Sequence, residues 1–153
     1  GSIGLATSTN GIHWARIGSE PVLSPGDSNA WDGLYIESPS ILYDGNSYFM
    51  WYSGVDKNYK VAIGVATSPD GITWTKYSGN PVLRRDADWT ERLSGTGHGA
   101  PFVCKDGSYK YVFHAHASEE KVQPRSSYIK ELTLSEEGII SIHGTVIRPV
   151  VVK

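Results

Sequence analysis

Short apolar and aromatic runs alternate with turn residues along almost the whole chain. The first complete series of runs lies at residues 38–43, 47–54, 60–67 and 72–77. A second series lies at residues 99–105, 108–117, 126–134 and 138–144. Runs of this length, separated by glycine, proline, asparagine and aspartate, predict β-strands joined by tight turns. Because no segment keeps a 3.6-residue apolar period, we expect an all-β protein with little or no helix.

The chain also repeats itself. Residues 3–23 (IGLATSTNGIHWARIGSEPVL) match residues 63–83 (IGVATSPDGITWTKYSGNPVL) at a constant offset of 60 positions. Trp14 corresponds in this way to Trp74, and we interpret both as structural pins of the same repeated turn. A period near 60 residues with four short antiparallel strands per unit is typical of a β-propeller blade.

The repeat divides residues 1–153 into the parts of a single partial β-propeller domain. The predicted units are a half blade, a full blade, a second full blade and a closing strand, at residues 3–23, 35–83, 89–143 and 144–153. The chain therefore holds about two and a half blades, whereas propellers close with about four to eight. Unpaired strand edges would be left, so we expect a longer protein or a second copy to complete the ring.

The composition of the chain limits which kinds of molecule it is expected to bind. Of 153 residues, 39% are hydrophobic and 20% are charged, which suits one globular domain. The formal net charge of −2 gives no electrostatic attraction to nucleic acid or to an acidic membrane. No apolar run approaches the roughly 20 residues of a membrane span. Cys104 is the single cysteine, so it has no internal disulfide partner, and its apolar surroundings indicate a small buried hydrophobe.

Four elements of the sequence resemble glycoside hydrolase family 43. They are YIESPSILYDGNSYFMWYSG, IGVATSPDGITW, NPVL and GTGHGAPFVCKDGSYKYVFHAHAS. The family and its relatives in families 32 and 68 share a five-bladed propeller. The resemblance covers nearly the whole chain, but it matches only the C-terminal half of the family's catalytic domain. It implies hydrolysis of glycosidic bonds in plant-type polysaccharides that contain arabinose or xylose.

Glu37 is the candidate catalytic acid. The first strand of each propeller blade lines the central channel, and Glu37 and His98 are expected at the mouth of that strand in successive blades. By resemblance, Glu37 is the general acid that protonates the departing glycosidic oxygen. Shielding from water by Trp31, Tyr35 and Pro39 would help a carboxylic acid to keep its proton near neutral pH. An exposed turn glutamate, or a partner for an arginine, is the plainer alternative.

The resemblance also implies that part of the machinery is missing. Hydrolysis with inversion needs a second carboxylate as the base, roughly 6.5–9.5 Å from the acid. In the family this base, and a further aspartate that tunes the acid, come from earlier blades. No aspartate of this chain matches either position, so the chain is expected to carry the acid and to lack the base.

Three histidines belong to the same region. By resemblance, His98 is catalytic and lies near the channel axis below the sugar, where the family's histidine often contacts a water-bound cation. Calcium is the candidate ion there, although no cofactor is required, and a turn histidine without a role is the alternative. His114 and His116 alternate along a strand and face one side of it. We disfavour a three-histidine zinc site and favour histidines that are satisfied within the strand, with His114 kept as a candidate substrate contact.

Several aromatic residues are candidate sugar contacts. Trp31, Trp51 and Trp89 are predicted to form a platform, because aromatic rings stack on the apolar face of a sugar ring. Tyr35 lies two positions before Glu37 and is expected to share its site.

Two polar residues complete the predicted site. Asp32 is close enough to Glu37 in the sequence to share the channel mouth, although it also suits an ordinary turn. Arg125 matches a position where the family often places an arginine that faces the active site. A surface-loop arginine is the competing interpretation for Arg125.

Three functions fit this sequence. The first is a glycoside hydrolase, and its alternative is a carbohydrate-binding or degenerate propeller that has lost the chemistry. The third is a sialidase-like repeat, which we disfavour because Asp70 and Gly71 are adjacent in SPDGITW, whereas that motif carries an extra residue between them. Two copies of about two and a half blades would make five, so we also consider a homodimer that exchanges the C-terminal strand.

Overall fold

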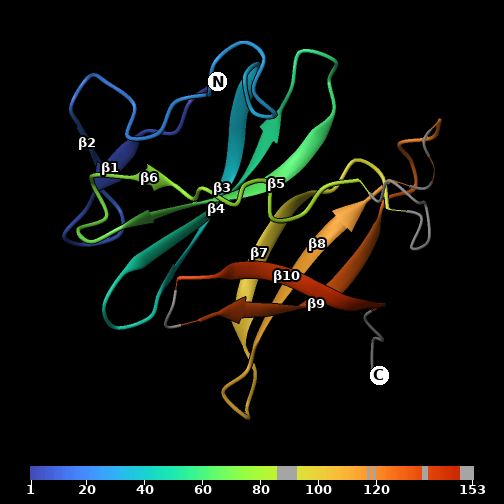
Figure 1. Cartoon of the computed structure of the whole chain (residues 1–153). Coiled ribbons are helices and arrows are strands. Elements are labelled where there is room, and N and C mark those ends of the chain that lie inside the picture. The colour runs from blue at the N-terminus through green and yellow to red at the C-terminus, as the bar shows by residue number, and fades with distance from the viewer. Residues whose placement is uncertain (86–92, 117, 119, 136–137, 149–153) are drawn as a thin grey trace.

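The computed structural model of the chain describes residues 1–85, 93–116, 118, 120–135 and 138–148. These residues form ten β-strands in three antiparallel sheets, and no helix occurs among them (Figure 1). In this part of the chain there is accordingly no helix long and apolar enough to cross a membrane. The prediction of an all-β protein is confirmed.

Each of the two large sheets is a meander of four strands. The middle sheet consists of β3 (Tyr35–Tyr43), β4 (Tyr48–Val55), β5 (Val61–Ser68) and β6 (Thr75–Lys76). The last sheet consists of β7 (Gly97–Val103), β8 (Tyr109–Ala115), β9 (Ser126–Leu134) and β10 (Ile140–Ile147). Before them comes a half blade, β1 (Leu5–Thr7) and β2 (Ala15–Ile17). This arrangement confirms the predicted partial β-propeller.

The sequence repeat is also a structural repeat. The indole Nε1 of Trp14 donates a hydrogen bond to the carbonyl oxygen of Gly11 at 3.2 Å, and Trp74 donates to Gly71 at 3.1 Å. Both indoles therefore pin the same kind of turn. Their surroundings differ, because Trp14 is 63% exposed whereas Trp74 packs against the apolar cluster shared with the half blade.

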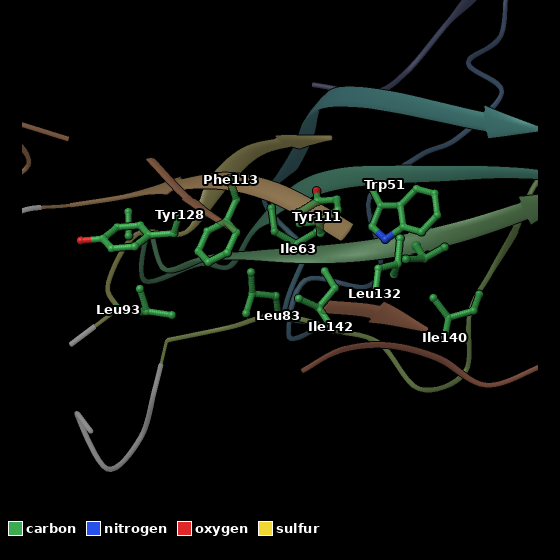
Figure 2. Packing of buried hydrophobic residues seen from close by; sticks show 12 residues of the cluster. Trp51, Ile63, Leu83, Leu93, Tyr111, Phe113, Tyr128, Leu132, Ile140 and Ile142 are labelled. Atoms are coloured by element: carbon green, nitrogen blue, oxygen red, sulfur yellow. The ribbon is translucent and has the colours of Figure 1, made fainter. Parts of the chain in front are cut away.

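The middle sheet is buried on both faces. On one face it packs against the last sheet through a large cluster (Figure 2) whose central members are Trp51, Ile63, Val65, Tyr111, Phe113 and Leu132. On the other face it packs against the half blade through Ile3, Leu23, Ile36, Met50, Tyr52 and Ala66. Strands β4 and β5 are therefore buried almost continuously, whereas β8 and β9 bury alternate residues.

The C-terminal segment differs from the prediction. Strand β10 continues to Ile147, which pairs with Ile129 of β9. Residues 144–147 therefore extend the fourth strand of the last sheet and do not begin a separate closing strand. The ladder is irregular between His143 and Ile147, and Gly144 has a φ of 77°. The glycine at this irregularity is the residue type that usually marks a turn, and for this reason the prediction ended the fourth strand there. Residues 149–153 of the predicted closing strand lie outside the described residues.

Candidate active site

Glu37 lies near the start of β3, an edge strand of the middle sheet. It pairs across the ladder with Ser53 of β4, and the register shifts between Glu37 and Ser40. Ser38, inside this bulge, has a φ of 54°, a left-handed conformation that residues other than glycine seldom adopt. Bulges re-aim the side chains beside them, and the side chain of Glu37 is exposed.

Strand β7 carries the same irregularity. Its register shifts directly after Gly97, and His98 has a φ of 46°. Gly97 holds the ladder position that Glu37 holds in β3, so the counterpart of His98 is Ser38. The prediction that Glu37 and His98 occupy the same position in successive blades is thus wrong by one residue, because the close sequence repeat of residues 3–23 and 63–83 does not extend to these two strands and so does not fix their alignment.

Ser53 connects the two sheets at this point. Its side chain is almost fully buried, and its Oγ accepts a hydrogen bond from the backbone N–H of His98 at 3.3 Å. Since Ser53 is also the cross-strand partner of Glu37, the two predicted catalytic residues flank one buried hydroxyl. Sequence reasoning missed Ser53, because a lone serine in the strand YFMWYSGV belongs to no motif.

The three histidines form a row beside this hydroxyl. The ring centroids of His98 and His114 are 5.3 Å apart, and those of His114 and His116 are 6.3 Å apart. Burial, followed by the charge of Arg125 and the two flanking histidines, lowers the pKa of His114 to about 4. Burial and Arg125 also lower the pKa of His116. The lowered pKa values keep the imidazoles of His114 and His116 neutral at neutral pH.

This arrangement predicts a loss of stability in mild acid. The unfolded His114 titrates near its ordinary pKa of 6.5, whereas the folded one titrates near 4. As the pH falls from 6.5 towards 4, His114 binds a proton in the unfolded chain but stays neutral in the folded chain. The free energy of unfolding therefore decreases. We expect urea unfolding of His114→Gln to depend less steeply on pH in this window. A variant with the slope of the wild type would contradict this assignment.

The zinc alternative gains no support from this geometry. Among the described residues, no three histidine, cysteine, aspartate or glutamate side chains converge as metal ligands would. Arg125 precedes β9 and is exposed, yet its charge acts on both His114 and His116. Its guanidinium therefore belongs to the electrostatic surroundings of the histidine row.

The tryptophan platform is not assembled as predicted. Trp51 has no exposed surface and lies in the core between the two large sheets, so it has no face for a sugar. This correction follows from the covering of both faces of β4, which the unbroken apolar and aromatic run of residues 48–52 does signal. Trp89 lies outside the described residues. Tyr35 is half-buried and, two residues before Glu37 on β3, shares the face of the sheet that carries Glu37.

Trp31 lies on the opposite face of the middle sheet. Its ring stacks on Tyr52 with centroids 5.6 Å apart, and it lies so close over Gly54 and Gly64 that a Cβ at either would clash with the indole. Gly54 follows Ser53 in β4 and faces away from the Glu37 side. The expectation that Trp31 shields Glu37 is therefore wrong, and the carboxylate is exposed.

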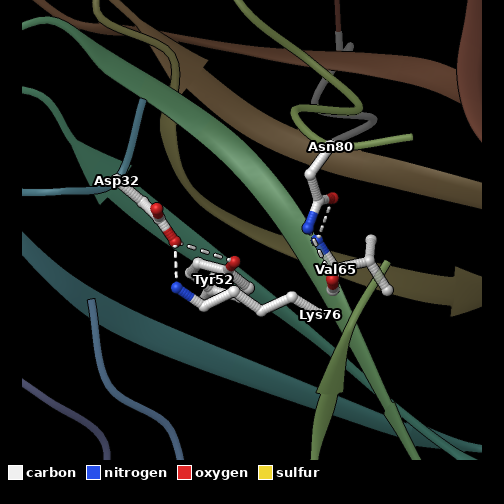
Figure 3. Close-up of polar contacts among 5 residues, drawn as sticks. All are labelled: Asp32, Tyr52, Val65, Lys76 and Asn80. Atoms are coloured by element: carbon white, nitrogen blue, oxygen red, sulfur yellow. Dashed lines mark hydrogen bonds and ion pairs between the residues drawn. The ribbon is translucent and has the colours of Figure 1, made fainter. Parts of the chain in front are cut away.

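Asp32 is also removed from the site, because it belongs to a buried ion pair (Figure 3). Only 2% of Asp32 is exposed, and its Oδ2 lies 2.6 Å from Nζ of Lys76 on β6. The phenol of Tyr52 donates to the same oxygen at 3.1 Å, and burial followed by the Asp32 charge raises the pKa of this phenol. In the same view, the side-chain amide of Asn80 pairs with both backbone groups of Val65 at 2.8 Å.

Removal of this carboxylate is expected to destabilise the fold. Asp32→Ala leaves the buried phenol of Tyr52 without an acceptor and Lys76 without its anion, so we expect the free energy of unfolding to fall by about 2–4 kcal/mol. Asp27→Ala in the same loop removes an exposed carboxylate and serves as the control, with a change within about 0.5 kcal/mol. Urea unfolding measures both, and equal midpoints would show that the pair contributes nothing.

Comparison with known proteins places the fold in a family. Residues 11–140 match the sequence pattern of glycosyl hydrolases family 43. An endo-1,4-beta-xylanase from Bacteroides thetaiotaomicron is 47% identical, with a TM-score of 0.71 over 81% of this chain. A thermostable family-43 glycoside hydrolase is 29% identical, with a TM-score of 0.68 over 88%. An alpha-L-arabinofuranosidase from Lactobacillus brevis, 20% identical with a TM-score of 0.62 over 89%, supports the fold alone.

The chain belongs to glycosyl hydrolases family 43, because the matched residues make up most of its length. It spans only 44% of the xylanase, 45% of the thermostable enzyme and 50% of the arabinofuranosidase. The resemblance inferred from the sequence motifs is therefore confirmed at the level of family and fold, and the match to part of a larger domain agrees with the partial propeller.

Proposed function

We propose that this chain is the acid-bearing part of a glycoside hydrolase, with Glu37 as the general acid. The observation that carries the proposal is that β3 and β7 bring Glu37 and His98 to either side of the Ser53 hydroxyl. Glu37 is exposed there, and across Ser53 lies His98, the first member of the histidine row. An exposed carboxyl group at the meeting point of two blades can reach a glycosidic oxygen.

The catalytic steps that this chain supplies are limited. Protonation of the departing oxygen by Glu37 would assist cleavage of the glycosidic bond. A water-activating base would have to come from outside this chain. Asp32, the aspartate predicted to share the channel mouth with Glu37, is bound to Lys76 on the other face of the sheet. The reaction therefore requires a partner surface that completes the ring.

The proposed substrate is an oligo- or polysaccharide that contains arabinose or xylose. Support comes from the family match and from similarity to an endo-1,4-beta-xylanase. The half-buried Tyr35 on the Glu37 face of β3 would offer an aromatic surface for the sugar ring. His98, His114 and Arg125 would supply polar contacts from the neighbouring blade.

A calcium ion near His98 does not fit the described residues by themselves. Calcium takes about 6–8 oxygen ligands, whereas His98 offers one ring nitrogen and no cluster of three ligating side chains occurs in the described part of the chain. Such an ion would need water or groups from beyond these residues, and no catalytic step is assigned to it.

A homodimer that completes the propeller is the proposed assembly. The half blade pairs only β1 with β2, which leaves one edge of β1 open among the described strands. An apolar groove of about 490 Å³ lies beside it, lined by residues such as Leu5, Ile17, Ile41, Met50, Ile72 and Trp74. The exchanged strand would have to lie beyond β10, since that strand runs to Ile147, which is already paired with Ile129 of β9. Light scattering should give about twice 16.7 kDa, and a monomer would contradict the dimer.

A non-catalytic carbohydrate-binding propeller is the second candidate. The observation that favours it is that Asp32 is paired with Lys76 on the other face of the sheet, so this carboxylate is not placed to act as a base beside Glu37. Turnover of aryl arabinofuranosides or xylosides, measured beside binding of arabinan and xylan, separates the two. The enzyme proposal predicts turnover that depends on Glu37, whereas affinity without turnover would favour the binding module.

A further inference from the structure

A second hollow lies at the same end of the middle sheet as Glu37 but on the other side of it. It has a volume of about 520 Å³, within the range of about 300–1,000 Å³ typical of small-ligand sites. Its lining includes Trp31, Lys60, Ala62, Pro81, Arg84 and Arg85. The sequence motifs assigned Trp31 to the Glu37 site, so the structure gives this indole a different cavity.

The charge of this hollow is predominantly positive. Among the lining residues that the structure describes, Lys60 and Arg84 are exposed cations and Asp56 is the anion. The Oδ1 atom of Asp56 accepts backbone hydrogen bonds from Asn58 at 2.8 Å and from Lys60 at 3.0 Å, so its carboxylate is engaged in its own turn. A ligand with a carboxylate would gain charge-assisted hydrogen bonds here, and a guanidinium matches the planar carboxylate best.

The indole of Trp31 is held in a fixed position from which it can contact a ligand in the hollow. It stacks on Tyr52 and is pressed against the backbone of Gly54 and Gly64, where no side chain larger than hydrogen fits. Such a fixed aromatic group costs little entropy when a ligand binds. Aromatic rings in carbohydrate-active proteins contact the apolar faces of sugar rings, so the hollow combines a sugar-binding ring with an anion-binding rim.

We propose that this hollow binds an acidic sugar unit of the uronate type, carried as a side unit of the polysaccharide. Ala62 in the lining belongs to the row Ile36–Gly54–Ala62, which directly neighbours the row of Glu37 and Ser53. The backbone of Ala62 is therefore about two strand spacings, or roughly 10 Å, from the strand that carries Glu37, and the hollow opens on the opposite face at the same end of the sheet. This inference rests on the proposed carbohydrate function and adds a preference for anionic substrates.

Affinity electrophoresis tests this preference with two matched polymers. One is a xylan that carries glucuronate side units, and the other is the same xylan after chemical reduction of its carboxyl groups to neutral sugars. We expect the wild-type chain to bind the acidic polymer about tenfold more tightly. The double variant Lys60→Ala/Arg84→Ala should lose this preference and keep its affinity for the reduced polymer.

The control variant is Lys105→Ala, which removes an exposed charge in the turn between β7 and β8. It should retain the preference, because that turn lies at the opposite end of its sheet from His98 and Gly97. Equal binding of both polymers by the wild type, or a preference that survives in the double variant, would overturn the acidic-sugar site alone. If neither polymer binds, the carbohydrate function and this site are overturned together.

Discussion

Replacement of Trp51 by alanine is expected to give the largest loss of stability of any substitution considered. Trp51 has no exposed surface, and its ring centroid lies 6.1 Å from those of both Phe49 and Tyr111. The residue therefore joins the two large sheets, and its truncation removes apolar contacts and leaves a cavity. Substitutions of this kind cost about 3–5 kcal/mol, which is a large part of the 5–15 kcal/mol that stabilises a typical domain.

Urea unfolding followed by circular dichroism measures this loss. Trp14→Ala is the matched control, since Trp14 is 63% exposed and makes one hydrogen bond in its own turn; its expected cost is about 1 kcal/mol. Trp51→Phe should cost less than Trp51→Ala, because it keeps most of the ring and removes an indole N–H that has no partner among the described residues. A Trp51→Ala midpoint equal to that of the wild type would refute this view of the core.

Replacement of Glu37 by glutamine is expected to give the second large effect, on turnover. The amide keeps the shape of the carboxyl group but has no acidic proton to transfer, and loss of general acid catalysis costs about 10²–10⁴-fold in rate. Stability should not change, because the side chain of Glu37 is exposed. The measurement is the rate of hydrolysis of aryl xylosides and arabinofuranosides, together with the urea midpoint.

Glu120→Gln provides the control for this substitution. Glu120 is an exposed glutamate whose backbone N–H donates a hydrogen bond to Oγ of Ser118. This bond does not involve the carboxylate, so the substitution leaves it in place. Its amide variant removes one negative charge as Glu37→Gln does, so the rate should remain that of the wild type. An equal loss in both variants would mean that net charge, and not proton transfer, governs the rate.

The strands and their order could be predicted from the sequence because two local signals agree. Turn residues bound each apolar run, and the 60-residue repeat fixes which runs are equivalent. The repeated indoles of Trp14 and Trp74 show how local this information is, since each pins a turn within three residues of itself. Meanders of this kind leave little ambiguity, because each strand pairs with the next along the chain.

The composition of the site could not be predicted as well, because it depends on contacts between distant segments. Asp32 finds Lys76 across 44 positions of sequence, and this pairing removes it from the neighbourhood that its sequence position suggested. The bulges at Ser38 and His98 shift the side chains by one place. Trp51 is buried because a second sheet covers β4, and the unbroken apolar run of that strand indicates burial on both faces without showing which sheet provides it.

The central claim is that Glu37 protonates the leaving group, and the dependence of the rate on that group tests it most directly. The same sugar can be attached to a weakly acidic phenol, which needs a proton to depart, or to dinitrophenol, which leaves readily as an anion. The proposal predicts that Glu37→Gln slows the first substrate strongly and the second only slightly. Equal slowing of both substrates, or no slowing of either, would contradict the assignment of Glu37 as the acid.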